Sequence, residues 1–245
     1  MENSAAYLIP HLLEDAVLLD VGCGPGTITS DLAKRLSGGR VVGFDRAGEV
    51  LDAARVEAAA AGLTNIEFKV GDVYGIEADD DTYDIVHAHQ VLQHLSDPVA
   101  ALIEMRRVCR PGGVVAARDS DYSAMTWFPA HDGLDRWLEL YLSLARANDA
   151  EPDAGRHLRS WALRAGFTSV ESSASVWCYS NDAERMWWSS MWADRVVGSA
   201  FATQAIERGV ATVSEVGLLA DAWYEWGRSA EGWFAVLHGE VLCRG

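Results

Sequence analysis

The sequence predicts an α/β fold with a mostly parallel sheet and helices on both of its faces. Three observations support this prediction. Short apolar runs alternate with helical stretches over the first 120 residues, as in proteins with a parallel sheet. A glycine-rich turn follows the first of these runs. Two further strand-like runs and helical segments rich in tryptophan make up the rest of the chain. Ligands of such sheets bind beyond the carboxyl ends of the strands.

Five strands and three helices are expected in the first half, where each strand is a short apolar or alternating run. The strands are 16–21, 40–45, 66–72, 83–89 and 114–120, and the helices are 29–39, 49–62 and 96–113. The third helix has the clearest boundaries, because Pro98 suits its first turn and Pro111 and Gly112 end it.

The second half is expected to hold two amphipathic helices, a strand, a tryptophan-rich helical segment and a final strand. In chain order they span 132–149, 153–167, 169–180, 181–231 and 233–244, which brings the sheet to seven strands. We expect one domain over residues 1–245. Its core would comprise about 10–122, 156–180 and 233–245, and a helical lid would comprise about 123–155 and 181–232.

The composition favours a globular protein that binds neither nucleic acid nor membranes. Lys plus Arg is 20 and Asp plus Glu is 36, so the net charge of −16 offers no basic field to phosphates. No run reaches the roughly 18 apolar residues of a membrane span, and the N-terminus lacks the features of a signal peptide. The four cysteines form no CxxC pair and show no zinc spacing. We therefore expect a cytoplasmic monomer or homodimer without a metal site.

The stretch DVGCGPGTIT, residues 20–29, carries three closely spaced glycines after a predicted strand. The dinucleotide fingerprint is G-x-G-x-x-G, but here the third glycine comes one residue early and Thr27 takes its place. Asp20 at the strand end would repel a pyrophosphate and suits a cationic or hydroxyl-bearing ligand. A P-loop is excluded, because no Gly-Lys-Ser/Thr follows.

This stretch resembles motif I of the class I S-adenosylmethionine (SAM)-dependent methyltransferases, and four further motifs follow in register. Asp45, which ends VVGFD, matches the acid with which that family holds both ribose hydroxyls, and Asp72 in VGDV matches the acid near the adenine amino group. The stretches YDIVHAHQVLQHLSDP and RRVCRPGGVVAARDSDY resemble the segments around the fourth and fifth strands. The resemblance covers about residues 10–122 and the last two strands, and it implies a Rossmann-like fold with SAM as cofactor.

The resemblance also assigns candidate site residues to the loop and to the strand ends. The implied cofactor site comprises Asp20, Gly22, Cys23, Gly24, Gly26, Thr27, Asp45, Arg46, Gly71, Asp72, Val73, His89 and Gln90. Methyl transfer requires aligned reactants, and a general base is needed only when the acceptor must lose a proton. The candidates for catalysis are His94, His89 and Asp119; for His94, a histidine bonded to loop backbone is the alternative.

Acceptor contacts are expected from residues after the fifth strand and from the tryptophan-rich segment. The candidates are His94, Asp119, Asp121, Tyr122, Trp188 and Trp192. For Asp119, Asp121 and Tyr122 the alternative is a solvated turn. For Trp188 and Trp192 the alternative is packing in the core of the lid. If the indoles do contact the acceptor, they would form an aromatic wall or a cation–π box around it.

We therefore predict a methyltransferase that acts on a small organic molecule, with quinone or lipid-like acceptors as the alternative. Two other classes remain open: an NAD-dependent oxidoreductase, which would bind NADH, and a SAM-binding protein without catalysis. The fourth strand is followed by Gln90 rather than by an Asn/Asp-Pro-Pro-Tyr/Phe motif, which counts against amino-methylation of adenine or of glutamine side chains.

Overall fold

A computed structural model describes residues 2–245, without the side chains of Glu2 and Asn3, and the chain clusters into two compact units. The first unit comprises 1–120, 154–175 and 238–245, and the second comprises 121–153 and 176–237. These boundaries lie within a few residues of those expected between core and lid. That residues 1–245 act as one domain stays a prediction.

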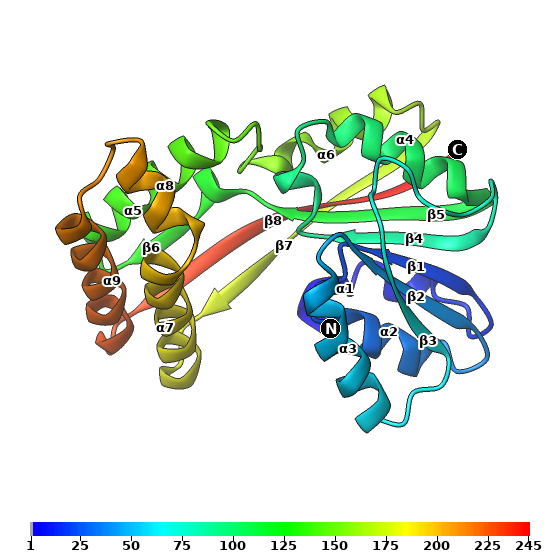
Figure 1. Cartoon of the computed structure of the whole chain (residues 1–245), viewed down its shortest axis with the longest axis horizontal. Coiled ribbons are helices and arrows are strands. Elements are labelled where there is room, and N and C mark those ends of the chain that lie inside the picture. The colour runs from blue at the N-terminus through cyan, green and yellow to red at the C-terminus, as the bar shows by residue number, and fades with distance from the viewer. Residues whose placement is uncertain (1) are drawn as a thin grey trace. The chain divides into compact units, whose positions relative to one another are not determined.

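The first unit contains the parallel sheet that the alternating pattern predicts (Figure 1). Its parallel strands, in the spatial order β3-β2-β1-β4-β5, are β3 (Ile66–Val70), β2 (Arg40–Asp45), β1 (Val17–Val21), β4 (Tyr83–His89) and β5 (Cys109–Ser120). β8 (Trp233–Arg244) pairs antiparallel with β5, from Val115 opposite Cys243 to Ser120 opposite His238, and β7 (Ser169–Tyr179) pairs with β8. The fold class is therefore confirmed.

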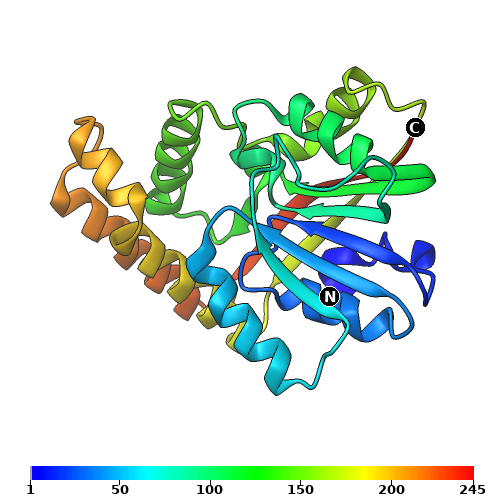
Figure 2. The same cartoon turned by 45° about the vertical axis from the view of Figure 1, so that its right-hand side comes forward.

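Helices cover both faces of this sheet (Figures 1 and 2). The helical elements of the first unit are α1 (Glu2–Ala5), η1 (Ile9–His11), α2 (Thr27–Arg35), α3 (Gly48–Ala60), η2 (Leu92–His94), α4 (Pro98–Val108) and α6 (Ala154–Arg164). Alternate residues of a strand face opposite sides. Leu18 of β1 accordingly packs in one cluster with Leu32 of α2, while Leu19 packs in another with Met105 of α4 and Leu158 of α6.

The second unit consists mainly of helices around an aromatic core. Its elements are η3 (Tyr122–Ala124), β6 (Thr126–Phe128), α5 (Asp132–Arg146), α7 (Asp182–Gly198), α8 (Ala200–Glu207) and α9 (Val213–Arg228). The segment 181–231, which was expected to be helical, thus contains three helices, α7, α8 and α9. α7 begins with a capping box formed by Asn181 and Glu184. No helix within residues 2–245 is both long and apolar enough to cross a bilayer.

The expected count of seven strands was one too low. The additional strand is β6, whose three residues pair antiparallel with the first residues of β8, from Thr126 opposite Ala235 to Phe128 opposite Trp233. Three residues give no detectable periodicity, and the segment becomes a strand because β8 offers it a hydrogen-bonding edge.

Candidate active site

A cavity of about 370 Å³ lies in the first unit, at the carboxyl ends of β1, β2 and β3 and along the segment that follows β4. It is lined by Val21, Gly22, Phe44, Asp45, Arg46, Gly71, Asp72, Val73, Tyr74, Gln90, Val91, His94 and Leu95. Parallel strands present their carboxyl ends at one edge of a sheet, so residues far apart in the chain meet there. The expected ligand position and the observed cavity therefore coincide.

The glycine loop allows close packing at the wall of this cavity. Gly22 has a φ of 64°, which favours glycine, and a Cβ at this position would lie 2.4 Å from Cγ2 of Val91. Gly26 has a φ of 76°, and its Cβ would lie 2.9 Å from the ring of Phe68. The loop can therefore approach β3 and the segment after β4 only because these positions carry no side chain.

The backbone N–H groups of this loop donate to the protein itself. Cys23 N donates to the Phe44 carbonyl at 3.0 Å, Gly24 N donates to Asp45 Oδ2 at 2.9 Å, and Gly26 N donates to the Cys23 carbonyl at 3.0 Å. A dinucleotide pyrophosphate needs such amides as donors at a helix N-terminus. The engagement of all three therefore disfavours a pyrophosphate at this loop.

Asp45 is fixed at the end of β2 as a hydrogen-bond acceptor. Its Oδ2 accepts from Gly24 N, and its Oδ1 accepts from Ala47 N at 2.8 Å. Each carboxylate oxygen has two acceptor sites, so one site on each oxygen is available to a ligand in the cavity. This arrangement suits a diol, whose two hydroxyls can each donate to one oxygen.

Asp72 forms the second acidic wall of the cavity, after β3. Its Oδ1 accepts from Tyr74 N at 3.0 Å and its carbonyl accepts from Gly75 N at 3.1 Å, which makes a tight turn over residues 72–75. Gly71 precedes this turn, and a Cβ there would lie 2.2 Å from the ring of Phe44. The strand can thus pass Phe44 and still bring Asp72 and Val73 to the cavity.

Gln90 and His94 reach the cavity from the segment after β4. Gln90 has a φ of 55°, which is uncommon for a residue with a side chain and concentrates at functional sites. Its N–H donates to the Arg118 carbonyl at 2.7 Å, and its Nε2 lies 3.1 Å from Nε2 of His238. His94 is exposed, and its Nε2 lies 3.2 Å from Nε2 of Gln93.

Asp20 lies behind the loop and does not line this cavity. Thr29 Oγ1 donates to its Oδ2 at 2.6 Å, and Nδ1 of His87 donates to its Oδ1 at 2.7 Å, with all three side chains buried. The acid therefore ties β1 to the first turn of α2 and to β4. It thereby helps to order the loop, and contact of Asp20 with the cofactor stays a prediction.

The remaining loop residues expected at the cofactor, namely Cys23, Gly24, Gly26 and Thr27, also lie outside the cavity lining. Burial and the nearby carboxylates of Asp20 and Asp45 raise the pKa of the Cys23 thiol, so it is protonated at neutral pH. Thr27 is the first residue of α2 and is exposed.

Of the other catalytic candidates, Asp119 is buried and His89 is half-buried. Burial, and then the positive charge of Arg118, lowers the pKa of His89 to about 2, which keeps its imidazole neutral. Asp119 is 0% exposed, and its Oδ1 accepts from Gln93 N at 3.1 Å, so it fixes the start of the segment that carries His94. Burial raises the pKa of Asp119 to about 7.

The candidates for acceptor binding after the fifth strand lie in the second unit. Trp188 and Trp192 are buried, with ring centroids 5.9 Å apart, and Tyr122 stacks on Tyr141 at 4.2 Å. Asp121 is buried and its N–H donates to the Leu237 carbonyl. These aromatic side chains thus pack the unit's core, and contact of these four residues with an acceptor stays a prediction.

Five residues of the cavity lining were not expected from the sequence: Val21, Phe44, Tyr74, Val91 and Leu95. Val21 follows Asp20 and Phe44 precedes Asp45, so their positions at the ends of two strands were enough to predict them as lining residues. Tyr74, Val91 and Leu95 belong to loops that converge only in the folded chain. Among residues 2–245, no group of three or more His, Cys, Asp or Glu side chains could hold a metal ion.

Comparisons with known proteins agree with this geometry. The family model described as a methyltransferase domain matches residues 12–154. An uncharacterized methyltransferase of Schizosaccharomyces pombe is 35% identical, over 98% of this chain and 88% of its own. The protein named "Probable methyltransferase ltbC" of Aspergillus luteorubrus is 31% identical, over 98% of this chain and 90% of its own. The fold matches that of the YcgJ protein from Bacillus subtilis, with a TM-score of 0.63 at 16% identity over the full length of both chains.

Proposed function

Because this chain belongs to the class I SAM-dependent methyltransferases, we propose that its cavity binds SAM and that the methyl group passes to a small organic acceptor. The proposal is carried by one observation. The carboxylates of Asp45 and Asp72 line the cavity, while the amides of the glycine loop already donate hydrogen bonds to the protein itself. A nucleoside without a pyrophosphate fits such a site, since it offers hydroxyl and amino donors to Asp45 and Asp72. NAD is disfavoured, because its pyrophosphate would need as donors the loop amides that already donate to the protein.

In this proposal the chain's own residues bind and orient. Asp45 accepts hydrogen bonds from the two ribose hydroxyls, and Asp72 and the Val73 backbone contact the adenine edge. Gly22 allows Val91, which also lines the cavity, to pack against the loop. The bound sulfonium supplies an electrophilic methyl group. The protein's main contribution is alignment, which can lower a barrier by about 7–11 kcal/mol.

The first experiment measures binding of S-adenosylhomocysteine (SAH) by isothermal titration, beside a titration with NADH. We expect SAH to bind and NADH not to bind. Asp45→Ala should weaken SAH binding by about 10- to 100-fold, because hydrogen bonds to a charged acceptor contribute about 1.5–3 kcal/mol. Asp52→Asn is the matched control, since Asp52 is an exposed acid that pairs with Arg55 on α3. NADH binding without SAH binding would reject the proposal.

We further propose that His94 is the general base for acceptors that must lose a proton, because it is exposed and lines the cavity. His94→Ala should lower kcat by roughly 100-fold or more while the affinity for SAH holds. Turnover would be measured as SAH release with amines, phenols and quinols as candidate acceptors. His157→Ala is the control, since His157 stacks on Trp161 outside the cavity. Equal kcat in His94→Ala and wild type would reduce His94 to a structural role.

A further inference from the structure

The segment that brings Asp72 and Val73 to the cavity contains no regular helix or strand. It runs from residue 71 to residue 82 and connects β3 to β4. Its first four residues line the cavity, and the rest pass along α4. A loop of this length is fixed only by what its backbone and side chains contact. The contacts that hold it therefore decide how well the acidic wall is preorganised.

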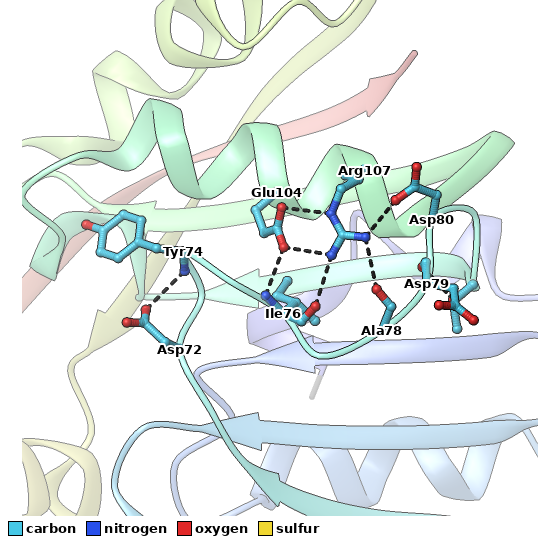
Figure 3. Close-up of polar contacts among 9 residues, drawn as sticks. Asp72, Tyr74, Ile76, Ala78, Asp79, Asp80, Glu104 and Arg107 are labelled. Carbon is cyan, nitrogen blue, oxygen red and sulfur yellow. Dashed lines mark hydrogen bonds and ion pairs between the residues drawn. The ribbon is translucent and has the colours of Figure 1, made fainter.

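Arg107, in the last turn of α4, holds this segment at several points (Figure 3). Its Nη2 donates to the Ile76 carbonyl at 2.9 Å, and its Nη1 donates to the Ala78 carbonyl at 2.9 Å and to Asp80 Oδ1 at 2.7 Å. The Arg107 carbonyl also accepts from Asp81 N at 3.1 Å. One residue thus binds the backbone of the segment at three positions, from Ile76 to Asp81.

Glu104, one turn earlier on α4, completes the arrangement. It receives two hydrogen bonds from Arg107, Nε to Oε2 at 2.9 Å and Nη2 to Oε1 at 2.7 Å, and its Oε1 also accepts from Ile76 N at 2.9 Å. The hydrogen bonds from Arg107 lower the pKa of Glu104, so both partners are charged at neutral pH. The N–H and the carbonyl of Ile76 are therefore both held by one ion pair on α4.

Fixing Ile76 fixes the turn before it. The Asp72 carbonyl accepts from Gly75 N and its side chain accepts from Tyr74 N, so residues 72–75 form one hydrogen-bonded unit that ends beside Ile76. From within this unit, the Tyr74 hydroxyl accepts from Asp97 N at 3.1 Å. The turn is tethered to both ends of α4, while neither Arg107 nor Glu104 lines the cavity.

We propose that Arg107 and Glu104 are positioning residues for the cofactor, which act by holding the turn that carries Asp72 and Val73. The assignment rests on the proposed function, because it names what the turn is positioned for. A planar guanidinium suits this role, since it donates in several fixed directions at once, whereas a lysine cannot reach all of these acceptors together. Val73 and Ile76 also pack in the core, so the segment stays attached to the sheet when the ion pair is removed.

The test compares Arg107→Met and Arg107→Lys with wild type in the full chain. Two quantities are measured: the Kd for SAH by titration, and amide hydrogen exchange of residues 72–81 without ligand. Arg107→Met should weaken SAH binding by about tenfold or more and speed exchange in this segment, since charge-assisted hydrogen bonds are lost. Arg107→Lys should lie between Arg107→Met and wild type in both measurements. Arg110→Met is the matched control, because Arg110 pairs with Asp84 and does not hold the segment.

Faster exchange at 72–81 together with weaker SAH binding in Arg107→Met, and neither change in Arg110→Met, supports the assignment. Unchanged SAH affinity in Arg107→Met, beside a wild type that binds SAH, overturns it and leaves the proposed function intact. Equal losses of affinity in Arg107→Met and Arg110→Met also overturn it, since they would reflect general destabilisation. A wild type that binds no SAH rejects the proposed function, and the assignment falls with it.

Discussion

Replacing Arg118 with methionine should lower the free energy of unfolding by about 3–5 kcal/mol, because it breaks a buried ion pair. Arg118 is 0% exposed and its Nε donates to Oε1 of Glu240 at 3.2 Å, while Glu240 is only 6% exposed. The guanidinium also donates to Ser175 Oγ at 3.0 Å. Removing the cation leaves a buried carboxylate without its countercharge, and the protein must then bury or solvate that charge at high cost.

Thermal unfolding followed by circular dichroism measures this effect. For a chain of this length each kcal/mol corresponds to roughly 2–4 °C, so the midpoint should fall by about 6–20 °C. The double variant Arg118→Met with Glu240→Gln removes the stranded charge and should recover much of the loss. If the double variant is no more stable than Arg118→Met, the loss comes from packing and the electrostatic explanation is wrong. Arg110→Met gives the exposed comparison, since Arg110 is 53% exposed and pairs with Asp84.

Replacing Asp119 with asparagine should change how stability depends on pH. Burial raises the pKa of Asp119 to about 7 in the folded protein, against an ordinary value of 3.8. A carboxyl group with a raised pKa binds its proton more tightly when folded. Its contribution is therefore fully present below about pH 4 and is lost as the pH rises through 7. Between pH 4 and pH 7 the free energy of unfolding of wild type should fall by on the order of 4 kcal/mol relative to that of Asp119→Asn, at 1.36 kcal/mol per pKa unit.

Urea unfolding of both proteins from pH 4 to pH 8 tests this prediction. Asparagine keeps an acceptor for Gln93 N, so Asp119→Asn should fold. Its free energy of unfolding relative to that of wild type should increase steadily as the pH rises. A difference in stability that is the same at pH 4 and pH 8 would mean that Asp119 does not titrate in this range. The pH profile of methyl transfer is a second measurement. Because Asp119 is buried, its titration should affect this profile through the position of the segment that carries His94, and Asp119 should not act as a base itself.

The parts of the site that the sequence could predict are those that depend on neighbours in the chain. The glycine loop and Asp45 lie at strand ends, and a strand end followed by glycines has the same local geometry in any parallel sheet. The order of strands and helices in the first unit follows from short patterns of the same kind. These features were therefore predictable to within a few residues.

The direction of buried polar side chains was less predictable, because it depends on partners far away in the sequence. Asp20 appears beside the loop in the sequence, yet His87 of β4 binds it from 67 residues away. Asp119 looked accessible after a strand, but the backbone of the segment after β4 encloses it. The two-residue period of a strand places His87 and His89 on one face of the sheet. Neither histidine lines the cavity, whereas the adjacent Gln90 does.

The aromatic core of the second unit gives the protein an internal optical probe. Nine of the ten tryptophans lie in that unit, and Trp161 alone lies in the first. Trp137 is 4.5 Å from Trp192 and 4.7 Å from Trp223 between ring centroids, close enough for their excited states to couple. Intrinsic fluorescence therefore reports on the second unit almost exclusively, whereas the Arg118 and Asp119 substitutions lie in the first. Superimposable fluorescence and circular dichroism melts of those variants would mean that the two units unfold as one cooperative system, and separate melts would mean that each has its own stability.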